Sequence, residues 1–200
     1  MCLRLVGSEM CIRDRNLSEL NAAGPEVLFA LHSLLDRHRK LELPNGEVLS
    51  LREDTYIFGT MNPTSLRDYA GTQSLNKAFA DRWVIWDKPF PNKEQLNTIF
   101  EKRYPKLQKE YRDLIIKLAT EINNSFMSDD ISINIETPMS LRTIVERIPI
   151  GLDVYAESSD PLKDTWENFV LPHVNKEDLD HYKTLWNTIV RKGPSIKPKL

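Results

Sequence analysis

The chain has 200 residues, of which 40% are hydrophobic and 28% are charged, and its formal net charge is −2. This length suits one ordinary domain or two small ones with a real core. A near-neutral chain has no obvious phosphate-binding stripe, which argues against nucleic acid as a partner. No apolar run approaches the roughly 18 residues of a membrane span, so we expect a cytoplasmic protein without a membrane partner.

The first 15 residues, MCLRLVGSEMCIRDR, differ from the rest of the chain. They carry positive charge but lack the apolar core of about 7 residues that a signal peptide needs. The string LVGSEMCIRDR resembles translated sequencing-adapter read-through, so we interpret residues 1–15 as a non-native segment and expect that the true N-terminal part is missing. Cys2 and Cys11 both lie in this segment, which leaves no disulfide or thiolate metal site in residues 16–200.

Residues 16–50 predict one helix and one hairpin. Pro25 suits a first helical turn, and the apolar residues that follow recur at spacings of three and four up to about Asp36, which is typical of an amphipathic helix. Residues 41–49 alternate on either side of an Asn45-Gly46 pair, which predicts a β-hairpin.

The stretch 56–86 carries most of the functional signal. The apolar run 56–60 predicts a buried strand, which ends at Asn62-Pro63 because proline cannot donate to a strand ladder. Asn62 would then lie at the carboxyl end of a strand, where open α/β sheets bind ligands. Apolar residues at 75, 78 and 79 predict a short helix that ends at Arg82, directly before a second apolar strand, Trp83–Trp86.

Residues 87–91 read as a linker, and everything beyond them predicts helices. Asn92 and Gln95 form a capping-box pair, and Pro105 ends that helix. A longer helix follows and is expected to stop before Asn123-Asn124-Ser125. Another opens at Thr137-Pro138 with an apolar stripe at 141, 144, 145 and 148. An aromatic set from 166 to 190 completes a helical core, and the Pro/Lys-rich tail 193–200 is expected to be disordered.

Three strings in this order, GTMNP at 59–63, YAGT at 69–72 and LNKAFADRW at 75–83, resemble the segment from sensor 1 to the arginine finger of AAA+ ATPases. The dynein-related branch, with its MoxR-like, CbbQ-like and McrB-like members, is the most similar. The resemblance implies that Asn62 is sensor 1, which orients the attacking water near the γ-phosphate, and that Arg82 is the finger presented to a neighbouring subunit's nucleotide. The alternatives are an Asn62 that caps a turn and an Arg82 that is a surface arginine.

Two further stretches match this family. Residues 16–21 resemble the end of the Walker B strand, where an Asp-Glu pair precedes Ile/Leu-Asn, so that Glu19 matches the carboxylate that polarises water. Ser18 departs from the pattern, because the family has an Mg²⁺-associated aspartate there and a hydroxyl is a weaker ligand. Ser-Leu-Arg at 140–142 resembles sensor 2, which implies that Arg142 contacts phosphate from the lid; the alternative is a helical ion pair with Glu146.

The resemblance implies an α/β fold: a partial P-loop (AAA+) nucleoside triphosphatase sheet in residues 16–90, followed by an α-helical lid in residues 91–192. It also implies ATP and Mg²⁺ as cofactors and a homo-oligomeric ring, a hexamer, that remodels an unknown protein substrate. No Gly-x-x-x-x-Gly-Lys-[Ser/Thr] occurs in the 200 residues, so we expect these residues alone to be inactive. A McrB-type GTP-dependent motor in DNA restriction, a catalytically inactive assembly subunit and a plain helical interaction module stay open.

Overall fold

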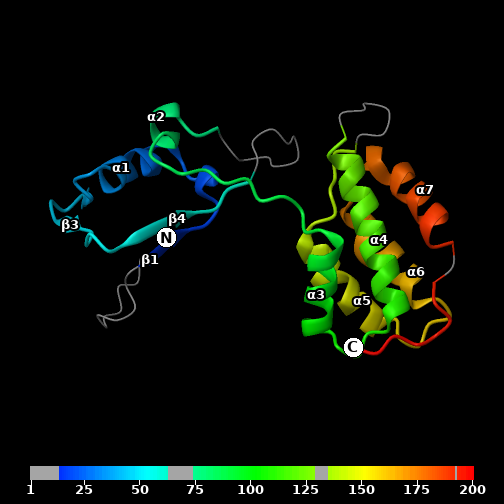
Figure 1. Ribbon diagram of the computed structural model, residues 1–200. Coiled ribbons are helices and arrows are strands. Elements are labelled where there is room, and N and C mark those ends of the chain that lie inside the picture. Colours follow the sequence, from blue (N-terminus) through cyan, green and yellow to red (C-terminus); the bar gives the residue numbers. More distant parts are fainter. Residues whose placement is uncertain (1–13, 63–73, 129–134, 192) are drawn as a thin grey trace. The chain divides into compact units, whose positions relative to one another are not determined.

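The computed structural model describes residues 14–62, 74–128, 135–191 and 193–200. The chain divides into an N-terminal unit, Met1–Asp87, and a helical unit, Lys88–Leu200 (Figure 1). Each unit has its own local packing and is described separately. Together they give the mixed α/β fold class that the sequence predicts, with a small parallel sheet and C-terminal helices.

The N-terminal unit contains two small sheets. Strands β1 (Asp14–Leu17) and β4 (Tyr56–Gly59) pair in parallel, with Leu17 opposite Gly59. Strands β2 (Lys40–Glu42) and β3 (Val48–Ser50) form the predicted antiparallel hairpin, whose turn contains Gly46 at a φ of 84°, a conformation that favours glycine. Pairing in β1 begins at residue 14, so two residues of the segment predicted to be non-native take part in the sheet.

Helices of the N-terminal unit pack through a line of aromatic rings. A 3₁₀ turn, η1 (Leu20–Ala22), leads from β1 to α1 (Pro25–Leu35), and α2 (Lys77–Ala80) lies against α1. The ring of Phe79 is fully buried and stacks on His32 with the ring centroids 5.2 Å apart. Trp83 continues the line, 5.9 Å from Phe79, and lies beside Gly59 of β4. These contacts tie α2 to both the helix and the sheet.

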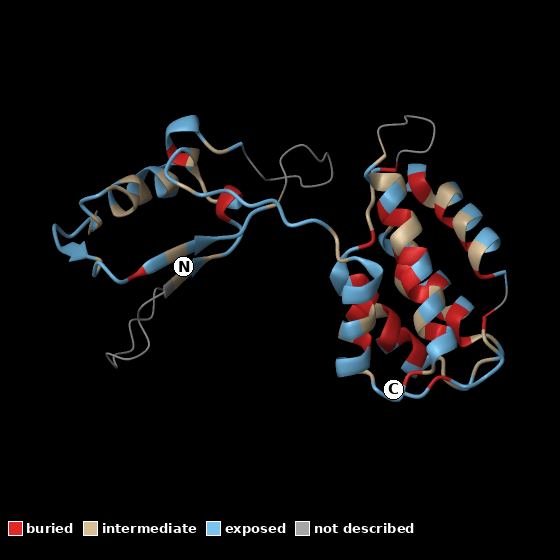
Figure 2. Ribbon diagram, viewed as in Figure 1, coloured by how far each residue is buried: buried red, intermediate tan, exposed pale blue. Residues whose placement is uncertain are grey.

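The prediction that residues 56–60 form a buried strand is half wrong, because the strand forms but is not buried. Tyr56 and Phe58 are 67% and 54% exposed, and Phe29 on α1 is 76% exposed (Figure 2). Among the described residues β1 alone pairs with β4, so each strand has an unpaired edge, and the face that carries Tyr56 and Phe58 is exposed. The expected strand Trp83–Trp86 does not form; Trp83 is half-buried, whereas Trp86 is 85% exposed.

The helical unit holds most of the chain's buried residues (Figure 2). Its α-helices are α3 (Lys93–Arg103), α4 (Lys109–Phe126), α5 (Ile148–Val154), α6 (Pro161–Thr165) and α7 (Leu179–Ile189). The π-helical turn η2 (Thr143–Arg147) precedes α5, and the π-helical turn η3 (Trp166–Val170) follows α6. The 3₁₀ turns η4 (Leu171–His173) and η5 (Lys176–Asp178) then lead into α7.

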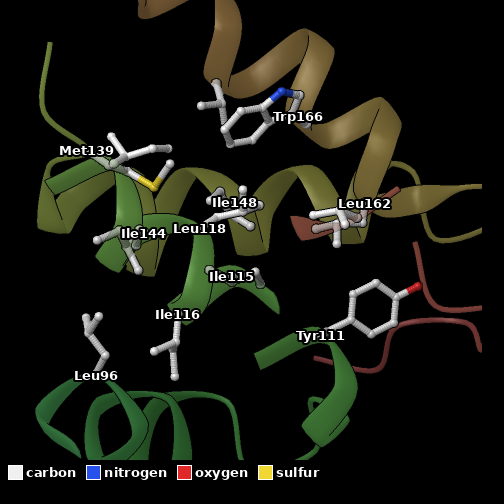
Figure 3. Close-up of a cluster of buried hydrophobic side chains, with 14 of the residues drawn as sticks. Leu96, Tyr111, Ile115, Ile116, Leu118, Met139, Ile144, Ile148, Leu162 and Trp166 are labelled. Atoms are coloured by element: carbon white, nitrogen blue, oxygen red, sulfur yellow. The ribbon is translucent and has the colours of Figure 1, made fainter. Parts of the chain in front are cut away.

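One core joins these helices. Figure 3 shows side chains from α3, α4, η2, α5, α6 and η3 directed toward a shared interior, with Leu118 and Ile148 near its middle. The rings of Trp166 and Trp186 stack 5.0 Å apart, which fastens α7 to η3. The capping box that the sequence predicts at the start of α3 is confirmed, since Asn92 and Gln95 exchange bonds of 2.9 and 3.0 Å.

A proline accounts for an irregular turn in the core. Pro149 lacks the N–H that would bond the carbonyl of Val145 four residues earlier, and the chain there adopts the π-helical turn η2. The hydroxyl of Tyr104, at the end of α3, donates to that Val145 carbonyl at 2.7 Å. A tertiary contact therefore supplies the hydrogen bond that the helix cannot make.

Two predictions for the helical unit need correction. The sequence predicts that the long helix stops before Asn123, but α4 continues to Phe126 because the buried Asn123 side chain bonds the backbone of Met139. The sequence also predicts a disordered tail at 193–200, whereas Tyr111 donates to the carbonyl of Ile196 at 2.7 Å and Gln108 donates to that of Lys197 at 2.6 Å. Tyr111 of α4 and Gln108, which directly precedes this helix, thus anchor the tail.

Candidate functional site

The carboxyl ends of β1 and β4 lie at one edge of the small parallel sheet. Beyond the last paired residues, the amide of Thr60 donates to the carbonyl of Leu17 at 3.0 Å, and the amide of Leu20 donates to the carbonyl of Thr60 at 2.8 Å. Parallel pairing therefore directs Glu19, after β1, and Asn62, after β4, to the same edge. Such an edge is where open α/β sheets bind ligands.

A buried amide joins the two segments at this edge. Asn21 in η1 is fully buried, and its Nδ2 donates to the backbone carbonyl of Asn62 at 2.8 Å. Its Oδ1 is also buried and has no hydrogen-bond partner within the described parts of the chain. In the sequence Asn21 is only the second residue of a Leu-Asn pair, and no role is predicted for it. The only signal was an amide beside the apolar Leu20, and its partner lies 41 residues away.

Glu19 occupies an unusual backbone conformation. Its φ of 53° and ψ of 49° lie in the left-handed region, which costs a non-glycine residue about 1 kcal/mol or more. The turn is closed by a bond from the amide of Ala22 to the carbonyl of Glu19 at 2.9 Å. The Glu19 side chain is exposed, and in the described residues no hydrogen bond or ion pair occupies its carboxylate. That carboxylate is available to a ligand or a water molecule.

Arg82 is held at the far end of α1. Its Nε donates to Oδ1 of Asp36 at 2.8 Å and its Nη2 lies 3.4 Å from Oδ2, while Nη1 donates to the carbonyl of Ala78. The hydrogen bond from Arg82 lowers the pKa of the Asp36 carboxyl, against the opposing effect of desolvation. Asp36 directly follows α1, whereas Glu19 precedes it, and the 11-residue helix is about 16 Å long.

Arg142 belongs to the helical unit, where it is exposed at the start of η2. The alternative pairing with Glu146 does not form, because Glu146 pairs with Arg103 of α3 at 3.6 Å. Within the residues that the structure describes, Arg142 makes no ion pair, so its guanidinium is available. Whether it contacts a phosphate stays a prediction.

The described residues show neither a metal-binding cluster nor a membrane-spanning helix. No group of three or more His, Cys, Asp or Glu side chains there is arranged to hold a metal ion. No described helix is long and apolar enough to cross a membrane. The YAGT string and Pro63 lie outside the described residues.

Known proteins resemble the chain most clearly over the N-terminal unit. Residues 16–83 match the family described as AAA domain (dynein-related subfamily). Midasin of Giardia intestinalis is 35% identical over 88 residues, which are 44% of this chain and 2% of midasin. Protein SERP0979 of Staphylococcus epidermidis is 25% identical over 158 residues, which are 76% of this chain and 57% of the relative.

Among solved structures, the crystal structure of an ATPase candidate from Cytophaga hutchinsonii matches with a TM-score of 0.38 and 16% identity, covering 94% of this chain and 67% of that one. The chain therefore spans only part of the curated relatives. The match over residues 16–83 covers the end of β1 and all elements from η1 to α2, and it includes Glu19, Asn62 and Arg82. Residues 16–83 of this chain are thus similar to the AAA domain of the dynein-related subfamily.

Proposed function

We propose that this chain supplies part of the active site of an AAA+ ring ATPase, which binds and hydrolyses ATP and remodels a protein partner. The observation that supports the proposal most strongly is the common edge formed by the ends of β1 and β4, from which Glu19 and Asn62 both leave. A carboxylate and an amide at the same edge of the sheet suit the task of polarising and orienting a water molecule.

Magnesium would neutralise charge on the nucleotide phosphates when bound. The hydroxyl of Ser18, exposed in the turn after β1, is the group of this chain at the position that matches the metal-associated aspartate. Glu19 would polarise the attacking water and the Asn62 amide would orient it. In this proposal Arg142 contacts phosphate from the helical unit, which acts as the lid.

Arg82 would act on the nucleotide of a neighbouring subunit in the ring. Its bonds to Asp36 hold it at the C-terminal end of α1, whereas Glu19 lies before the N-terminal end of this helix. A guanidinium there is better situated to reach outward than to serve the same subunit's Glu19. Arginine fingers supplied by a partner contribute about 10³-fold or more to phosphoryl transfer where they have been measured.

Mixing two inactive variants tests the proposal in a gene product that carries these residues together with a P-loop. Arg82→Ala should remove most ATP hydrolysis and leave nucleotide affinity nearly unchanged, and Arg82→Lys should restore little because a point charge lacks the planar fork. Arg82→Ala subunits mixed with Glu19→Gln subunits should regain turnover, since some interfaces then combine an intact finger with an intact acid. Arg52→Ala, in the same unit, is the matched control. Co-assembled rings that regain nothing would exclude a finger in trans.

Ser18 favours a second candidate, an inactive AAA+ subunit that serves assembly, because a hydroxyl is a weak ligand for a hard cation. Ser18→Asp distinguishes the ATPase from the inactive assembly subunit. If the wild-type protein does not hydrolyse ATP and Ser18→Asp gives a large gain in turnover, the assembly role is supported. GTMNP also fits the McrB-type motors, and a preference for GTP over ATP in the same assay would identify that branch.

A further inference from the structure

The guanidinium of Arg82 keeps two N–H donors after its contacts with the described residues are counted. Arginine carries five donors. The Nε–H and one Nη2–H face the Asp36 carboxylate side-on, and one Nη1–H faces the carbonyl of Ala78. One N–H on each of Nη1 and Nη2 is left, and together these form the end-on fork that matches two oxygens of a carboxylate or phosphate.

We propose that Asp36 is a positioning residue for Arg82, fixing its side chain so that the end-on fork is presented to an anionic group of a neighbouring subunit. This inference rests on the proposed function for the identity of that group, a transferring phosphoryl. The pair itself does not depend on it.

The surroundings of the pair favour a defined geometry. Asp36 is the residue after α1, and its backbone amide donates to the carbonyl of His32 at 3.0 Å, which fixes the start of its side chain. Arg82 follows α2, whose Phe79 is fully buried against His32. Both partners therefore extend from anchored backbone. The side chain of Asp36 is 43% exposed and that of Arg82 is 27% exposed, so a partner subunit can reach the contact.

The energetic argument concerns the entropy of a long side chain. A free arginine loses rotamer entropy when it is ordered at a phosphate. Two bonds to Asp36 and one to Ala78 order it before the nucleotide arrives. The Asp36 carboxylate also has an opposite effect, because it offsets part of the positive charge of Arg82. If the pair did no more than restrain Arg82 in this way, it would slow hydrolysis. These two effects predict changes of opposite sign when the carboxylate is removed.

Asp36→Asn in the full-length protein distinguishes them. Positioning predicts a fall in kcat of about tenfold or more with the KM for ATP unchanged, since small displacements of a catalytic group are costly. Asp36→Glu should recover part of the loss. Asp54→Asn, which alters the exposed Asp54–Arg52 pair of the same unit, is the matched control and should leave turnover unchanged. In an Arg82→Ala background, Asp36→Asn should cause no further loss.

Two results would overturn the inference: a higher kcat in Asp36→Asn, which indicates restraint, or an equal loss in the Arg82→Ala background, which indicates that Asp36 acts elsewhere. A second measurement needs no turnover. In the 200-residue chain, the Nε–H NMR signal of Arg82 should exchange slowly with water and become fast in Asp36→Asn. Unchanged exchange would exclude the pair. If exchange responds but Arg82→Ala hydrolyses ATP normally, the proposed function fails and the pairing stands.

Discussion

The side chain of Asn123 is predicted to be the polar contact on which the helical unit most depends. Its Oδ1 accepts from the amide of Met139 at 2.8 Å, and its Nδ2 donates to the carbonyl of Met139 at 3.2 Å. Both residues are buried, so no exposed surface offers water as a replacement. The pair fastens α4 to the segment that leads into η2.

Asn123→Ala leaves two buried backbone groups of Met139 without a partner. Each such group costs about 1–3 kcal/mol. Alanine is the better helix former by up to about 0.7 kcal/mol, which offsets part of the loss. The expected decrease in the free energy of unfolding is therefore about 1–5 kcal/mol. A decrease near the middle of this range, about 3 kcal/mol, corresponds to about 1–3 M in the urea midpoint for a small domain.

The neighbouring residue provides the control. Asn124→Ala makes the same chemical change one position along α4, where the side chain is exposed, and should raise the stability by no more than about 0.7 kcal/mol through helix propensity. Urea unfolding can be followed by the fluorescence of Trp166 and Trp186, which are buried in this unit. Equal midpoints for the two variants would refute the reasoning, because burial of the Asn123–Met139 bonds is all that distinguishes them.

Two further predictions concern stability. Amide exchange in the 200-residue chain should be much slower in α4 and α5 than in β1 and β4, since the apolar side chains of the small sheet are largely exposed; equal protection in both units would contradict this. Burial, together with the charge of Asp160, raises the pKa of Tyr111 from 10.0 to about 12, so the unfolded chain loses this proton first and the helical unit should lose stability between these pH values. Urea midpoints at about pH 9 and about pH 11 should differ less in Tyr111→Phe than in the wild type, and an undiminished difference would assign the loss to another group.

Much of the local structure could be read from the sequence. The capping box at Asn92 and Gln95, the turn at Asn45-Gly46 and the limits of α1 each depend on residues within a few positions of one another. Backbone geometry and neighbouring side chains decide such features, so the residue pattern contains the information they need. The family resemblance over Glu19, Asn62 and Arg82 was likewise carried by short contiguous strings.

Other features required tertiary structure because their partners are far apart in the chain. Asn21 meets Asn62 across 41 residues and Arg82 meets Asp36 across 46, and no local pattern names either partner. Asn123 looked like a helix end, since asparagine favours turns, until its bonds to Met139 satisfied it inside α4. Burial depends in the same way on what lies opposite: the apolar β4 has the composition of a core strand, yet Tyr56 and Phe58 stay exposed because no described element covers them. Composition determined which strands and helices could form, and only long-range packing decided which of their side chains are buried, paired or left available for chemistry.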